Sequence, residues 1–154
     1  MMAHGITPIL NVSDLEASFA WFESFGWRKL WAYGEPPDFG AVRSGTCEIF
    51  LSLDNQGGRA EPGSRDTGMW MTVWVEDVDD VHRMCLERGL EVTWPPTDEP
   101  WGVREMHVRH PDGHTFRVSR GIPHDHDHDH DHPHDHDHPH DHDHDHPHDH
   151  DHPH

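Results

Sequence analysis

Histidine is the residue type whose spacing in this sequence points most directly to chemistry. From residue 124 to residue 154 it occupies every second position, mostly with aspartate between: His124, His126, His128, His130, His132, His134, His136, His138, His140, His142, His144, His146, His148, His150, His152 and His154. Imidazole is the commonest protein ligand of nickel, copper and zinc, and aspartate adds charged oxygen donors. The repeat therefore predicts binding of divalent transition-metal ions, with copper held most tightly.

The same repeat predicts a segment that does not fold by itself. Residues 123–154 comprise 16 His, 11 Asp and 5 Pro, so no side chain there can join a hydrophobic core. Such a segment cannot compensate for the entropy lost on ordering. We expect one folded domain over residues 1–120 and a disordered metal-binding tail over 121–154. A biological role for the metal stays open, because a short repeat can also expand without being selected.

Aromatic and charged side chains form the second group of candidates. In a strand over residues 69–75, alternation places Trp70 and Trp74 on the face opposite Met71 and Val73. Glu105, His107 and Arg117 alternate with aliphatic residues in the same way in the last two expected strands. One sheet face is therefore aliphatic, as a core requires, and the other mixes aromatic rings with charges. A face of the second kind is typical of a ligand-binding wall.

These residues admit two interpretations. The aromatic set, which is Phe39, Phe50, Trp70, Trp74 and Trp101, can stack on flat rings and hold cations over the ring faces. The same rings can instead pack a dimer interface or fill the hollow of the sheet. We assign Trp27 and Trp31 to packing.

The acidic candidates are also open to two interpretations. Asp38 and Glu105 are candidates for binding an amine or sulfonium group of a ligand, and a desolvated carboxylate does this best. Glu105 is equally able to pair internally with Arg104, Arg117 or His107. No nucleophile with a recognisable partner accompanies Glu105, His107 and Arg117, so we expect no catalytic residues.

The elements that must position these residues occur twice along the chain. A strand, a helix and three strands are expected at residues 5–11, 13–26, 27–33, 39–43 and 46–53, and again at 69–76, 77–89, 90–94, 103–109 and 114–119. Ser13 with Glu16 predicts a capping box at the first helix. Two copies of one unit indicate a pseudo-symmetric α+β domain. His110 and His114 lack metal-ligand spacing and are expected in surface or turn positions.

Charge and composition narrow the partners. The 19 acidic and 11 basic residues outside the tail leave the folded part at −8, which argues against nucleic acid and anionic membranes as partners. Two cysteines, 38 positions apart, do not make a disulfide framework. Met1 to Ala20 lacks the pattern of a signal peptide, so we expect a cytoplasmic protein.

Four segments resemble the glyoxalase/bleomycin-resistance/dioxygenase (vicinal-oxygen-chelate) superfamily. They are NVSDLEASFAWFESFGW at 11–27, DFGAVRSGTCEIFLSL at 38–53, WMTVWVEDVDDVH at 70–82 and PWGVREMHVRHPDGHTFRV at 100–118. Within the superfamily they are most similar to the bleomycin-resistance proteins. The resemblance implies two βαβββ modules whose curved mixed sheets form cups. It also implies a homodimer with exchanged N-terminal strands and two interfacial grooves.

The resemblance implies a function as well. The grooves would sequester an aromatic, cationic antibiotic of bleomycin type, or a similar aromatic metabolite, without catalysis. Phe39 and Trp101 match groove aromatics of the resembled family, and Ser52 matches a groove hydroxyl.

Metal-dependent relatives carry His, Gln or Glu at positions that correspond here to Thr7, Phe50 or Ser52, Trp70 and Arg117. None of these is a good metal ligand, so we expect no cofactor in the folded domain. A metal-dependent lyase or dioxygenase stays an alternative, as does a metal-buffering protein whose domain is only a carrier.

Overall fold

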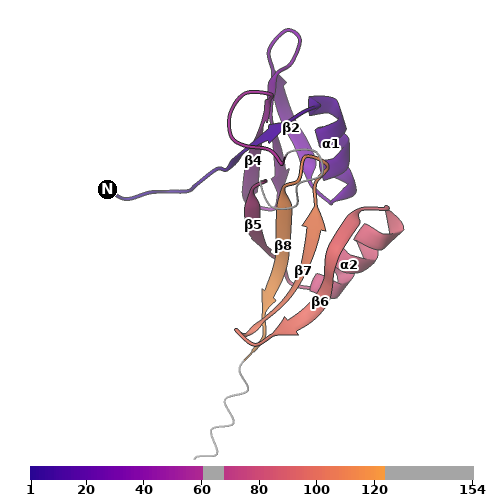
Figure 1. Ribbon diagram of the computed structural model, residues 1–154. Helices are drawn as coiled ribbons and strands as arrows, with labels where there is room; N and C mark the ends of the chain where they lie inside the picture. The colour runs from indigo at the N-terminus through magenta and orange to yellow at the C-terminus, as the bar shows by residue number, and fades with distance from the viewer. Residues whose placement is uncertain (61–67, 124–154) are drawn as a thin grey trace, which may run out of the picture. The chain divides into compact units, whose positions relative to one another are not determined.

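The structure is a computed structural model that describes residues 1–60 and 68–123. The elements follow in the order β1 (Ile9–Val12), α1 (Leu15–Ser24), β2 (Arg28–Tyr33), β3 (Phe39–Ser44), β4 (Cys47–Leu53), β5 (Trp70–Trp74), α2 (Val78–Glu87), β6 (Glu91–Glu99), β7 (Val103–Arg109) and β8 (Thr115–Gly121) (Figure 1). This is βαβββ twice, as predicted. The histidines at 124–154 lie outside the described residues, so their predicted metal binding stays a prediction.

Each module forms its own four-stranded mixed sheet. The strand orders are β1-β4-β3-β2 and β5-β8-β7-β6. In both sheets the first strand of the module runs parallel to the last one, and the other neighbours are antiparallel. The predicted α+β class is therefore confirmed. Because the strand order is the same, rows of paired residues in one sheet can be compared with rows in the other.

Helix α1 begins one residue later than the capping box predicts. Asp14, not Ser13, is the N-cap, with an extended backbone and a carboxylate that accepts from the Ala17 N–H at 2.9 Å. The Ser13 hydroxyl instead donates to Asp112 at 2.7 Å. The capping box was wrong because the Asp14 carboxylate, and not the Ser13 hydroxyl, accepts from the first-turn N–H, while Ser13 binds Asp112, which is 99 residues away in sequence.

The core lies where α1 meets the second module. Phe22 is completely buried, and the Phe116 ring of β8 lies 5.8 Å from it between ring centroids. Phe25 and Trp21 also contact Phe116, at 5.2 and 5.6 Å. Burying one such phenylalanine contributes about 1.5–3 kcal/mol. Because the aliphatic sheet faces are used here, the mixed aromatic and charged faces are left for another purpose.

The turn between β7 and β8 joins the two modules through buried imidazoles. His110 and His114 flank the turn, as one of the two predicted alternatives has it, but they are 1% and 0% exposed, so the surface alternative was wrong. His110 Nδ1 accepts from the Asp112 N–H at 3.0 Å, so in the neutral ring Nε2 carries the proton and donates to Ser18 of α1 at 3.0 Å. His114 likewise accepts from the Met69 N–H at 3.1 Å and donates to the Asn11 carbonyl at 2.8 Å.

Both imidazoles are held neutral. The pKa of His110 falls from 6.5 to about 4, mainly because burial penalises the charged ring and secondly because His114 is near, while the Asp112 carboxylate acts against this. Burial also lowers the pKa of His114, against its hydrogen bond to Asn11. Gly113 completes the turn with φ of 85°, and a side chain there would meet Ala60. The turn is therefore a fixed joint between modules.

Strand β6 continues well beyond the predicted residues 90–94. It reaches Glu99 through Pro95 and Pro96, and two register shifts around Trp94 accommodate the prolines. Prolines cannot donate to a ladder, so an edge strand with bulges is where they are tolerated, and β6 is an edge strand. The extension brings Trp94 and Glu99 to the same side of the second sheet.

Candidate functional site

Three of the predicted residues line a hollow of the first sheet. Asp38, Phe39 and Ser52 lie together with Asn55 and Gln56 around about 280 Å³. Ser52 is 1% exposed, and its hydroxyl accepts from the Gln56 N–H at 3.1 Å. The serine is therefore positioned by the loop that follows β4. We call this the first-module hollow.

An aromatic cluster continues this face. Trp31, Phe39 and Phe50 contact one another with ring centroids 5.5–5.8 Å apart. Trp31, which the sequence assigns to packing, packs against both other rings, and it is 38% exposed, so it also forms part of the open face of this cluster. Strand pairing explains this: Trp31 stands opposite Ala41, which stands opposite Phe50, so all three share one face. The small Ala41 leaves room for the two rings to meet.

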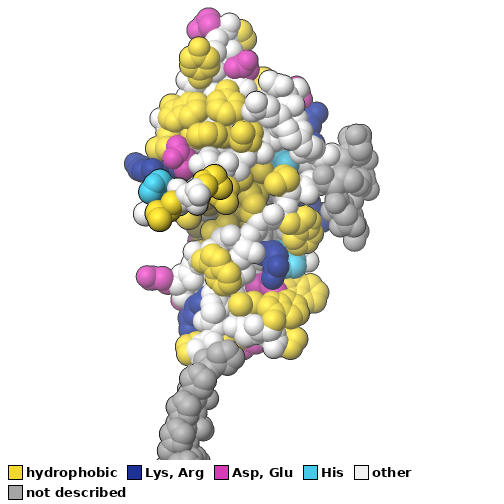
Figure 2. Space-filling view, turned by 90° about the vertical axis from the view of Figure 1, so that its left-hand side faces the viewer, with side chains coloured by type: hydrophobic (Ala, Val, Ile, Leu, Met, Phe, Trp, Pro, Cys, Tyr) yellow, Lys and Arg dark blue, Asp and Glu magenta, His cyan; other side chains and the backbone are white. Residues whose placement is uncertain are grey.

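Five predicted residues come together in a hollow of the second sheet. Trp70, Trp101, Glu105, His107 and Arg117 line about 370 Å³, together with Trp94 and Glu99, which the sequence analysis did not select. On the face shown in Figure 2, hydrophobic side chains surround a small group of acidic, basic and histidine side chains below the centre. We call this the second-module hollow. Glu99 was not selected because the predicted strand ends at residue 94, which leaves Glu99 in a loop. The bulged extension of β6 is what brings it to the hollow.

An ion pair forms the floor of the second-module hollow. The Glu105 side chain is 2% exposed, and its Oε2 accepts from Arg117 Nε at 2.7 Å. His107 Nε2 lies 3.6 Å from the same carboxylate and adds to the pair when it is protonated. Arg104, the other candidate partner, binds Asp79 at 2.9 Å and Asp98 at 3.0 Å instead. Of the alternatives left open by the sequence, Glu105 therefore pairs with Arg117.

Indoles form the walls of the same hollow. Trp70 stands edge-on to His107 at 5.4 Å, and Trp94 lies 6.2 Å from His107 on a tilted plane. A turn in which the Gly102 N–H donates to the Glu99 carbonyl at 3.1 Å carries Trp101 between its two ends. Trp70, Trp94 and Trp101 are 46%, 44% and 61% exposed, so their faces remain accessible. The arrangement suits planar rings or cations.

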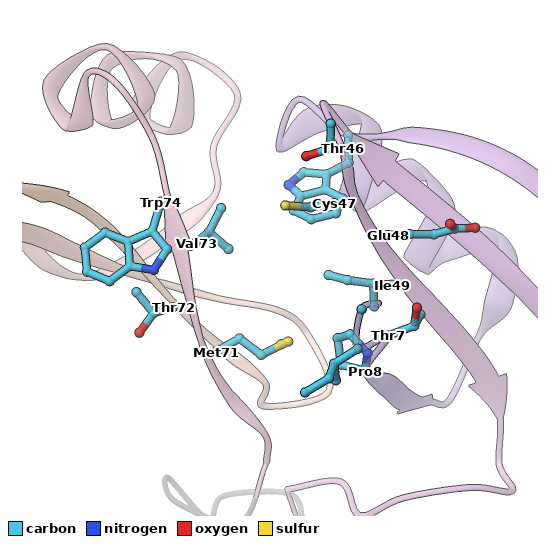
Figure 3. Close-up of a pocket in the computed structure, with 13 residues that line it drawn as sticks. Thr7, Pro8, Thr46, Cys47, Glu48, Ile49, Met71, Thr72, Val73 and Trp74 are labelled. Atoms are coloured by element: carbon cyan, nitrogen blue, oxygen red, sulfur yellow. The ribbon is translucent and has the colours of Figure 1, made fainter. Parts of the chain in front are cut away.

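Apart from Phe50, which belongs to the aromatic cluster but lines neither hollow, Trp74 is the predicted ligand residue that the structure does not bring into either hollow. It shares a face of β5 with Trp70 but is 66% exposed at the far end of the strand. In Figure 3 its ring and Thr72 point away from β4, while Met71 and Val73 point toward Ile49 and Cys47.

A larger pocket lies beside β5, and Trp74 is one of the residues that line it. It encloses about 400 Å³ between β5, the start of β4 and residues 5–8 (Figure 3). Its lining is mostly apolar, with Ile49, Met71 and Val73 prominent. We place binding in the two hollows rather than here, because polar groups and accessible rings converge in the hollows.

The residues present do not fit a metal ion of the kind that some proteins of this fold use. Within residues 1–60 and 68–123, no three His, Cys, Asp or Glu side chains lie close enough to hold one together. At the corresponding positions, Phe50 and Trp70 carry no donor for a metal, and Arg117 places a fixed positive charge.

No helix in the described ranges is long and apolar enough to cross a membrane.

Fold and site together define a protein of paired βαβββ modules with aromatic hollows on the open sheet faces. The family model described as Glyoxalase/Bleomycin resistance protein/Dioxygenase superfamily matches residues 4–118. The chain belongs to this superfamily, and the resemblance found in the sequence is confirmed. No curated protein sequence matches it.

Several solved structures share the fold. TioX from Micromonospora sp. ML1 is 23% identical with a TM-score of 0.63, over 77% of this chain and 100% of that one. A bleomycin-binding protein complexed with bleomycin is 17% identical with a TM-score of 0.62, over 77% and 99%. A bleomycin resistance determinant encoded on the transposon Tn5 gives 17% and 0.62, over 77% and 98%. At such identities these likenesses establish the fold alone.

Proposed function

We propose that this protein binds and sequesters an aromatic, cationic small molecule of bleomycin type, without transforming it. The observation that carries the proposal is the second-module hollow, where three accessible indoles surround polar groups. Stacking on such rings adds about 0.5–1.5 kcal/mol per contact beyond simple burial. The bleomycin-binding protein that shares the fold supports this class of ligand.

The proposal assigns no catalysis to the site because its polar groups are already bonded within the protein. Glu105 and Arg117 bind each other, and the Ser52 hydroxyl accepts from a backbone N–H. A nucleophile needs a base within hydrogen-bonding reach, and no described imidazole is bonded to Ser52. The site is therefore suited to binding a ligand and not to activating a nucleophile.

The proposal includes a homodimer. The two hollows lie on separate sheets, and each is open. A second chain would bring its first-module hollow against the second-module hollow and form two grooves per dimer. Exposed Trp31, Trp70, Trp74, Trp94 and Trp101 support this, because large exposed aromatic surfaces mark interaction sites.

Bleomycin titration tests the proposal. Adding bleomycin should quench tryptophan fluorescence and saturate at two molecules per dimer, in a protein whose mass in sedimentation is twice 17.9 kDa. Trp101→Ala should weaken binding about tenfold. The matched control is Leu86→Ala, which removes a 60% exposed apolar side chain on α2 and should leave binding unchanged. No quenching up to millimolar bleomycin contradicts the proposed ligand.

We propose a second, separate property for the tail. The alternating histidines at 124–154 would bind nickel, copper or zinc, and the support is the sequence itself. Calorimetry with Cu²⁺ and Ni²⁺ should show several sites on the full chain and a loss of most of them in a chain ending at Pro123. Binding should weaken below about pH 6.5 as imidazoles protonate. Equal binding by both chains contradicts this property and leaves the drug-binding proposal untouched.

A further inference from the structure

One of the two acidic residues that the sequence offered for a ligand cation, Glu105, is already paired inside the protein. Glu105 is 2% exposed and accepts from Arg117 Nε at 2.7 Å. A ligand cation would have to displace a fixed guanidinium to reach it, at the cost of leaving a charge unpaired. The pair also cancels its own charge, so Glu105 does not make the second-module hollow negative.

Glu99 is in a different position. It is the last residue of β6, half-buried, and it lines the same hollow. The hydrogen bond that the structure gives its side chain comes from the Trp94 indole N–H, at 3.1 Å to Oε1. Throughout the described part of the chain, no Lys, Arg or His side chain forms an ion pair with it. Glu99 therefore gives the hollow one uncompensated negative charge.

One indole is hydrogen-bonded to this carboxylate, and a second lines the same hollow. The hydrogen bond from Trp94 orients both the ring and the carboxylate, and it leaves Oε2 without an assigned donor. Trp101 follows Glu99 by two residues in the turn closed by the bond from the Gly102 N–H to the Glu99 carbonyl. Pro100 restricts the backbone between them, and Gly102 adopts φ of 86° at the end of the turn. The Pro-Trp-Gly sequence thus presents an indole next to a carboxylate.

A half-buried carboxylate that shares a hollow with exposed indoles is recognition chemistry for organic cations. The ring faces attract a cation through their quadrupole, and a charge with no internal partner adds direct attraction. We propose that Glu99, with Trp94 and Trp101, forms a cation subsite within the second-module hollow, for an amine, quaternary ammonium or sulfonium group attached to a planar aromatic ring. The inference deepens the proposed function and rests on it for the ligand class, but it assigns the contact to Glu99 in place of Glu105.

The test compares two small probes that differ in charge. N-methylquinolinium and quinoline are both flat bicycles, and only the first is charged at pH 8. Binding to the ¹⁵N-labelled full chain is followed at the indole N–H signals of Trp94 and Trp101, which report this hollow and not the acidic tail. We expect a Kd for N-methylquinolinium about five to tenfold below that for quinoline.

Two variants locate the effect. Glu99→Gln keeps an oxygen that accepts from Trp94 and should reduce the preference for the charged probe to less than twofold, with quinoline binding unchanged. Asp98→Asn removes the same charge one residue away, where the side chain binds Arg104 instead, and should keep the preference. In the unaltered protein, raising NaCl from 20 to 500 mM should weaken the binding of the charged probe and leave the binding of quinoline unchanged. This measurement does not depend on whether any variant folds.

The outcomes separate this inference from the proposed function. An equal preference in Glu99→Gln and in the unaltered protein, or no shift of either indole signal with either probe, overturns the cation subsite. If bleomycin still binds in that case, the drug-binding proposal stands without it. If the probes discriminate through Glu99 while bleomycin does not bind, the subsite stands and the ligand identity fails.

Discussion

The two modules have the same strand pairing and opposite chemistry at equivalent positions. Across the first sheet, Trp31 faces Ala41 and Ala41 faces Phe50. Across the second, Trp94 faces His107 and His107 faces Arg117. The first module therefore has a row of two aromatic rings with a small residue between them. The second module has, in the same place, a row of one ring and two polar groups.

The next row shows the same difference. Phe39 stands opposite Ser52 in the first sheet, and Glu105 stands opposite Ser119 in the second. The first-module face, which we call the first wall, carries three rings that contact each other, which favours flat rings, and its hollow is lined by the polar groups of Asp38, Ser52, Asn55 and Gln56. The second wall carries an internal ion pair, a further carboxylate and indoles that stand apart, which favours polar and charged groups. A ligand held between two such walls would need both a flat ring and a charged group, and the proposed ligand class has both.

The turns between the last two strands also differ. In the first module Gly45 and Thr46 are exposed, whereas in the second His110 and His114 are buried. The largest predicted effect follows from this. Since the folded pKa of His110 lies below the unfolded value of 6.5, protons bind the unfolded chain more tightly, and stability is complete above about pH 6.5. It should fall by about 3 kcal/mol from His110 alone as pH drops to about 4.

Urea unfolding at several pH values checks this, using His110→Asn for comparison. The tail contributes to both chains equally, so the difference between their pH profiles reports the joint. The variant should be less stable at pH 7 and lose less stability on acidification. Parallel profiles would mean that His110 is not held neutral by the fold.

The second prediction compares the two walls directly. Arg117→Met leaves the Glu105 carboxylate buried without its partner and should cost about 2–3 kcal/mol, below the full cost of a buried pair because Arg117 is 37% exposed. Phe50→Met, at the equivalent position, changes volume little and should cost about 1 kcal/mol. Adding Glu105→Gln to Arg117→Met should recover most of the loss. Urea unfolding measures the loss of unfolding free energy in each variant. Equal losses for Arg117→Met and Phe50→Met would contradict the proposed difference between the two walls.

Local sequence predicted the repeated units, the strand alternation and most residues of the second-module hollow, because these depend on period and on neighbouring residues. It could not predict His110 and His114 as buried, since their partners Ser18 and Asn11 are about a hundred positions away. Glu99 was missed because bulges around Pro95 and Pro96 extend β6 past the expected end. The contact of Trp31 with Phe50 depends on the strand register that places Ala41 between them. In each case tertiary pairing decided the outcome.

The third prediction tests the first wall. Trp31→Ala removes the ring that contacts both Phe39 and Phe50, and should weaken bleomycin binding about fivefold to tenfold. Trp31→Phe should retain most of the affinity, because a ring still stands opposite Ala41. Calorimetric titration measures both. If Trp31→Ala binds as tightly as the unaltered protein, the first wall takes no part in the groove.

The smallest effect distinguishes a helix cap from a contact between modules. Asp14→Ala and Asp77→Ala remove the equivalent N-caps of α1 and α2, which accept at 2.9 and 3.1 Å, and each should cost about 1 kcal/mol of unfolding free energy. Ser13→Ala removes only an exposed hydrogen bond to Asp112 and should cost about 0.5 kcal/mol. Since Asp112 also opposes the lowered pKa of His110, Ser13→Ala should in addition alter the acid unfolding of the joint, whereas Asp77→Ala should not. If Ser13→Ala destabilises more than Asp14→Ala at pH 7, the contact between the modules contributes more to stability than the cap of α1, and the expected order of the two effects is wrong.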